Sequence, residues 1–240
     1  MEILEKPISE PAARFCEDAI PKIEAFYGKG VEWRWSTKLP EGFQAQYTLG
    51  KETTPIIQLR PPKKDAAFSA VVAHEVGHLV LNTEAYPRAQ SVPSTDPRLG
   101  LMLYNTMVDP EVNARVKAAG VDVEPMERLL LANVVRGLFD KKVHEPTMLD
   151  AGNSGLWTLT FLSMILKDDL GLSKEFERIL NKRYSTTLQR AVGLAQEVRA
   201  AGLDSPGGCF KAMEIARERL RLQSLVLIEE GTPAPAQERT

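Results

Sequence analysis

The sequence predicts an α+β protein that is mostly helical, with a small sheet near its beginning. Two observations predict this fold class. Apolar residues alternate with period two only between residues 31 and 60, whereas helical spacing with recognisable caps dominates after Pro61-Pro62. The chain has 240 residues, of which 43% are hydrophobic and 26% charged, and this composition is typical of a globular protein.

The individual elements follow from caps, breakers and periodicity. Ser9 is a suitable N-cap for a helix over 9–28, which stops at Gly28. Trp33 and Trp35 belong to the first of about three strands within 31–60. Asp65 is well placed to cap the next helix, which runs to about residue 82. Further helices are predicted at about 98–119, interrupted or kinked at Pro110, and at 125–143, 153–170, 173–183, 185–201 and 207–229.

This pattern predicts two successive domains and a tail. Residues 1–122 hold the sheet and the motif described below, and residues 123–230 form a helical C-terminal subdomain packed on them. Residues 231–240 are rich in Pro and Ala, so we expect a disordered tail.

Charge and hydropathy exclude some classes of partner. The formal net charge is −2 and the pI is near 6.0, which argues against binding to nucleic acid or to an anionic membrane. The longest apolar run, 156–166, is well short of the roughly 20 residues that span a bilayer. We see no secretory signal, and Cys16 and Cys209 fit no disulfide or metal spacing, so we expect a cytoplasmic protein. The oligomeric state is not predicted.

The informative motif is His74-Glu75-Val76-Gly77-His78. On a helix, His74 and His78 lie one turn apart on the same face and can bind one metal ion, while Glu75 lies beside that ion. The rest of 70–81 is apolar, so three polar groups are expected in a buried helix, where a zinc ion and its water would satisfy them. Gly77 indicates close packing at that point. The alternative is that the histidines only form hydrogen bonds in the core.

This segment resembles the active-site helix of the zincin metallopeptidases, and the predicted strand before it also fits the zincin fold. The resemblance implies a catalytic zinc with three protein ligands and an open position for water. It also implies that Glu75 is the catalytic residue, accepting a proton from the zinc-bound water. The resemblance covers about residues 55–115.

Three carboxylates compete for the role of third ligand. Glu84 has the spacing of the metzincins, but Leu81 stands where those enzymes need a glycine. The segment from Asn105 through Asp109 to Asn113 places three polar residues on one helix face.

This segment resembles that of metallopeptidases associated with von Willebrand-type domain proteins and, more loosely, the gluzincin arrangement. The resemblance implies that Asp109 is the ligand and that Asn113 or Asn105 supports the site. Glu111 remains the alternative ligand. A purely structural interpretation is also open, in which Asp109 caps a helix beginning at Pro110 and Glu111 is an acidic residue of its first turn.

Taken together, these features predict a zinc-dependent metallopeptidase with a zincin-like domain, which hydrolyses peptide bonds in a peptide or protein substrate. Its metal ligands would be His74, His78 and Asp109, with Zn²⁺ as the cofactor. The alternative is a zinc-containing helical binding or regulatory protein on a peptidase-like scaffold without catalysis.

Overall fold

The computed structural model describes residues 1–39, 44–49, 54–61, 65–140, 145–147, 149–167, 180 and 183–232. Its fold is α+β and mostly helical, as the sequence predicts. Contacts divide it into two compact units. Within the described residues, the first unit comprises Met1–Glu84 and 112–140, and the second comprises Ala85–Glu111 and 145–232. These units interleave along the chain.

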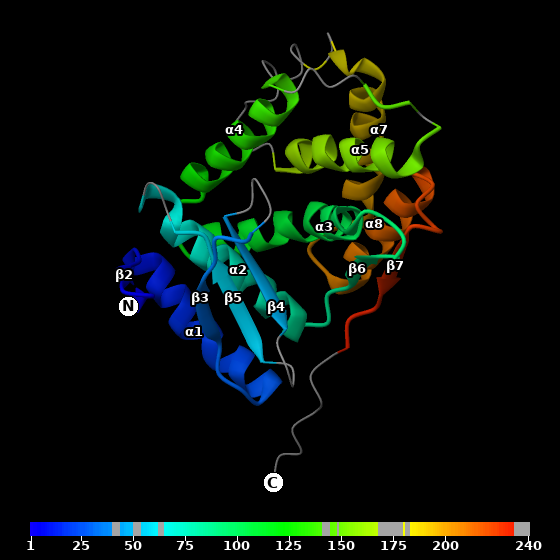
Figure 1. Ribbon diagram of the computed structural model, residues 1–240. Coiled ribbons are helices and arrows are strands. Elements are labelled where there is room, and N and C mark those ends of the chain that lie inside the picture. Colours follow the sequence, from blue (N-terminus) through cyan, green and yellow to red (C-terminus); the bar gives the residue numbers. More distant parts are fainter. Residues whose placement is uncertain are drawn as a thin grey trace. The chain divides into compact units, whose positions relative to one another are not determined.

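Within the described residues, the first unit holds a small mixed sheet of three strands, a second sheet of two strands and three complete helices. The mixed sheet has the order β3-β5-β4, with β3 parallel and β4 antiparallel to β5. Helix α1 packs along α2, which also contacts β4 and β5 (Figure 1). The elements are β1 (Glu2–Ile3), β2 (Lys6–Pro7), α1 (Glu10–Tyr27), β3 (Glu32–Trp35), β4 (Ala45–Leu49), β5 (Pro55–Leu59), the short 3₁₀ helix η2 (Asp65–Ala67), α2 (Phe68–Thr83) and α4 (Glu124–Asp140).

Helix α2 is the centre of the first unit. It is apolar on nearly all sides, and thirteen of its residues are buried, as expected for a helix surrounded by other elements. A Cβ atom added at Gly77 would lie 2.8 Å from Cγ1 of Val112, which confirms the close packing predicted for this glycine. Its small size therefore lets a neighbouring helix approach α2 at the level of the motif.

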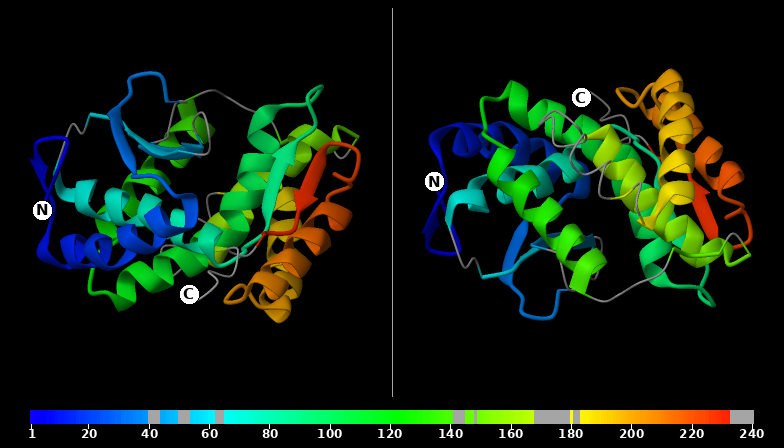
Figure 2. Two further views of the ribbon diagram at one scale, coloured as in Figure 1. Left: turned by 90° about the horizontal axis from the view of Figure 1, so that it is seen from below. Right: turned by 90° about the horizontal axis from the view of Figure 1, so that it is seen from above.

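In its described part, the second unit holds three further complete helices and a two-stranded sheet. Asp150 caps α5 by accepting from the Asn153 amide, and Ser205 caps α8 by accepting from the Gly208 amide. Strand β6 pairs antiparallel with β7, and Figure 2 shows the two side by side. The elements are β6 (Arg88–Ser91), α5 (Ala151–Leu166), α7 (Ser185–Ala201), α8 (Pro206–Arg219) and β7 (Val226–Glu229).

Helix α3 (Pro97–Ala118) runs through the division between the units without interruption. Pro110 lies inside it, so Asp109 does not cap a helix that begins there. Proline removes one intrahelical hydrogen bond and crowds the carbonyl four residues earlier. Close to that point, the Cys209 thiol donates to the carbonyl oxygen of Met107 at 3.8 Å.

The sequence prediction failed in two places in the second unit. The helix predicted over 207–229 ends at Arg219, and its last part is strand β7. The partner strand β6 lies between residues 82 and 98, where the sequence predicted neither a helix nor a strand. Most of the predicted helix 173–183, and residues 233–240 of the predicted tail, lie outside the described residues. None of the helices in the described ranges combines the length and apolar character that crossing a bilayer requires.

Candidate metal centre

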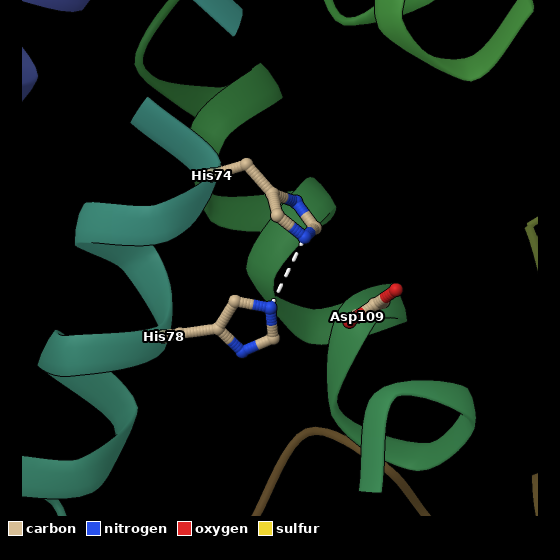
Figure 3. A group of neighbouring side chains, drawn as sticks. All are labelled: His74, His78 and Asp109. Atoms are coloured by element: carbon tan, nitrogen blue, oxygen red, sulfur yellow. Dashed lines mark hydrogen bonds between the residues drawn. The ribbon is translucent and has the colours of Figure 1, made fainter. Parts of the chain in front are cut away.

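His74 and His78 lie one turn apart on α2 and face each other. Their Nε2 atoms are 3.1 Å apart, and the ring planes meet at 86° (Figure 3). Only 8% of His74 and 3% of His78 is exposed. The predicted i, i+4 arrangement is therefore present, and both imidazoles point to the same position.

Neighbouring side chains hold each ring in place. Nδ1 of His74 is hydrogen-bonded to Oδ1 of Asn113 at 2.8 Å. The ring of His78 stacks on Tyr47 of β4, with centroids 5.7 Å apart. Of the two asparagines that the sequence offered as support for the site, Asn113 is thus the one that bonds a histidine.

Asp109 joins this pair. Ligand atoms of His74, His78 and Asp109 all lie within 4.8 Å of one another, and all three residues are buried. Asp109 precedes Asn113 by one turn of α3, and Figure 3 shows it on the helix beside the two histidines. Lys167, the C-cap residue of α5, places Nζ 2.5 Å from Oδ2 of Asp109.

The spacing of these atoms fits zinc. Zinc binds imidazole nitrogen at about 2.0–2.1 Å with tetrahedral geometry, so two such nitrogens stand about 3.3 Å apart. The 3.1 Å between His74 and His78 is close to this value. Two imidazoles and one carboxylate are also a known ligand set of catalytic zinc.

Glu75 follows His74 on α2 and is 8% exposed. A carboxylate so far from bulk water is costly unless polar groups or a cation surround it. Glu75 is not part of the group of ligand atoms formed by His74, His78 and Asp109.

The two competing carboxylates lie elsewhere. Glu84 forms an ion pair with Arg115 at 2.7 Å, and its side chain is 43% exposed. Glu111 lies near Cys209, and its charge, after the larger effect of burial, helps to raise the pKa of that thiol to about 12. Among the described residues, the group that can hold a metal includes neither Glu84 nor Glu111.

Two residues near the centre were not found from the sequence. Lys167 binds Asp109, and Glu127 of α4 accepts a hydrogen bond from Nδ2 of Asn113 at 3.0 Å. Lys167 directly follows α5, and Glu127 lies in the first turn of α4. A basic residue at a helix C-terminus and an acidic residue at an N-terminus both interact favourably with the helix dipole. In the sequence, each therefore has the charge that is common at its end of a helix, and nothing in the sequence marks it as part of a metal centre.

Comparisons of this chain with protein-family models, with curated proteins and with solved structures found no match.

Proposed function

We propose that this protein is a zinc-dependent metallopeptidase in which His74, His78 and Asp109 hold the ion and Glu75 transfers protons. The observation that carries the proposal is the buried group of two imidazoles, 3.1 Å apart at Nε2, and one carboxylate. Nitrogen and oxygen donors in this combination suit zinc better than calcium or magnesium, which prefer oxygen ligands alone.

The charges of the chain also suit a divalent cation. The carboxylates of Asp109 and Glu75 bring two negative charges to the two positive charges of zinc, and the Lys167 ammonium adds one positive charge beside Asp109. Buried charges are tolerated where they are compensated in this way. Asn113 adds no charge, because it contacts His74 through a neutral amide.

When bound, zinc supplies a Lewis acid that polarises the scissile carbonyl and activates water. The Glu75 carboxylate accepts a proton from the attacking water, whose oxygen forms a bond to the carbonyl carbon. The carbon–nitrogen bond then breaks, and Glu75 passes the proton to the leaving amine nitrogen. The products are a carboxylic acid and an amine, and Glu75 is again ionised. We propose the cytoplasm as the compartment, because Cys16 and Cys209 are buried free thiols.

The first test is elemental analysis of protein purified without chelators, which should contain about one zinc per chain. The second is hydrolysis of a mixture of quenched fluorescent peptides of random sequence. Glu75→Gln should keep the zinc and the fold but lose hydrolysis, because an amide cannot accept the proton. Glu84→Gln makes the same charge change nine residues along the same segment and should leave both properties unchanged.

Other outcomes would point elsewhere. Protein that contains no zinc and takes up none at micromolar concentration would remove the proposal. Zinc uptake by protein that hydrolyses none of the peptides would favour the alternative, a binding or regulatory protein. Hydrolysis at the wild-type rate by Glu75→Gln would show that the proton acceptor is misassigned.

A further inference from the structure

A buried chain of hydrogen bonds lies behind His74 and involves three helices of the first unit. Nδ1 of His74 on α2 bonds Oδ1 of Asn113 on α3, and Nδ2 of Asn113 donates to Oε1 of Glu127 on α4. Asn113 is 4% and Glu127 8% exposed. Nζ of Lys117 lies 3.5 Å from the same Oε1, so a positive charge stands beside the Glu127 carboxylate and favours its ionised form.

The ionised carboxylate fixes the direction of every bond in this chain. It can only accept, so it requires the NH₂ group of Asn113 on its side. The carbonyl oxygen of Asn113 then faces His74 and also can only accept. His74 must therefore carry its proton on Nδ1, which leaves the lone pair on Nε2.

The same reasoning extends to His78. Nε2 of His74 is then the acceptor in the 3.1 Å hydrogen bond between the two rings, so Nε2 of His78 must be the donor. In metal-free protein, the two imidazoles are thus in opposite tautomers. A metal ion bound at this pair takes a lone pair from each ring, so only His78 has to move its proton from Nε2 to Nδ1.

We infer that Glu127 is a positioning residue that acts through Asn113 to fix His74 as the Nδ1–H tautomer, so that His78 alone changes tautomer when metal binds. The relevance to metal rests on the proposed function, but the tautomer of His74 in metal-free protein does not. Metal-ligating histidines are commonly oriented by a polar partner of this kind, whose loss typically costs 10–100-fold in metal affinity.

The test is long-range ¹H–¹⁵N NMR of the full chain at mildly alkaline pH, with His144→Gln used to assign the third histidine. Metal-free protein should show His74 as Nδ1–H and His78 as Nε2–H. Addition of zinc should convert His78 to Nδ1–H and leave His74 unchanged. Conversion of His74 instead of His78 would overturn the inference.

The variant that breaks the chain is Glu127→Gln. Its amide can donate as well as accept, so Asn113 is no longer held in one orientation and His74 should populate both tautomers. Zinc affinity should fall by about 10-fold or more. Glu124→Gln, which alters an exposed glutamate three residues earlier on the same helix, should change neither the tautomer nor the affinity.

The rescue variant is Asn113→Asp with Glu127→Gln. It exchanges the carboxylate and the amide, keeps the net charge and lets the new amide donate to the new carboxylate, which again accepts from His74. The Nδ1–H tautomer should return. Failure to return in the folded double variant, or a single tautomer of His74 in Glu127→Gln, would overturn the inference. Protein that shows the tautomer effects but binds no zinc would support this role and remove the proposed function.

Discussion

Helix α3 supports the candidate centre through two side chains one turn apart, and their surroundings differ in kind. Asn113 connects His74 to Glu127 through an uncharged amide. Asp109 forms a direct, largely buried ion pair with Lys167. The hydrogen bond with Asn113 thus already orients His74 for an ion. The Asp109 carboxylate, which the ion would also need, is instead bound by the ammonium group of Lys167. We infer that the carboxylate side responds more strongly to the arrival of metal.

The largest expected effect is on the aspartate side. Asp109→Ala should lower zinc affinity by at least about 100-fold, because loss of a ligand should cost no less than loss of a supporting group. Competition with a chromophoric chelator measures this, with circular dichroism to verify the fold. Glu111→Ala is the matched control on the same helix and should keep wild-type affinity. A large loss in the control and none in Asp109→Ala would transfer the role to Glu111.

The second prediction concerns Lys167, whose positive charge compensates the Asp109 carboxylate. Lys167→Met leaves a buried carboxylate without its ammonium partner, so metal-free protein should lose about 2 kcal/mol of stability, somewhat less than a fully buried pair. Zinc would supply the missing charge, so zinc should raise the Tm of the variant more than that of wild type. Thermal unfolding with and without zinc tests this. Lys211→Met on the surface of α8 is the control. An equal zinc effect in Lys167→Met and wild type would mean that Lys167 and the ion do not share Asp109.

The third prediction tests the packing that brings α3 to α2. Gly77→Ala gains up to about 1 kcal/mol of helix propensity, but the added Cβ stands 2.8 Å from Val112, and overpacking typically costs about 1–3 kcal/mol. We expect a net loss of about 1 kcal/mol in urea unfolding. Combined with Val112→Ala, the same substitution should become neutral or stabilising. Equal effects in both backgrounds would rule out this contact as the cause.

The smallest expected effect is at the exposed ion pair of Asp96 and Arg98, which contrasts with the buried pair of Asp109 and Lys167. Asp96 accepts from the backbone amide of Arg98 at the start of α3 and pairs with its guanidinium, and its side chain is 40% exposed. Hydrogen bonding to Arg98 holds the pKa of Asp96 below its usual value. Asp96→Ala should cost about 0.5–1 kcal/mol at neutral pH.

The pH and salt dependence of this difference follow from the lowered pKa. Because the folded pKa is depressed, the stabilisation is present above the unfolded pKa and is lost as the pH falls through the folded value. High salt should also weaken the charged part of the contribution, since exposed pairs are screened. Chemical unfolding at several pH values and salt concentrations measures both. A difference that grows in acid would contradict the assigned sign.

Sequence patterns predicted the helices well where their signals are local. Helix α7 has the bounds expected, and α2 carries the motif on the predicted face. The prediction failed where structure depends on distant partners. Residues after Arg219 continue a plausible helical pattern, but Arg221 has a positive φ of 58° and Val226–Glu229 pairs with β6 far away in the sequence. No local glycine or proline marks that change.

The same limit applies to the candidate centre. The motif predicted His74, Glu75 and His78 because the helical period alone relates them. Asp109 and Asn113 stood out because they are polar residues in an apolar stretch of one helix. Glu127 and Lys167 come from other helices, and their relation to the centre exists only after those helices have packed.

The interleaving of the two units also has a consequence for the order in which the protein is made. During synthesis, α4 completes the described helices of the first unit before α5, α7 and α8 exist. Strand β6 must wait for β7, about 140 residues later, or roughly 7–30 s at 5–20 residues per second. Throughout that interval β6 lacks the strand with which it pairs in the described part of the chain. The nascent chain is therefore open to pairing with another copy at Arg88–Ser91 until β7 has been made.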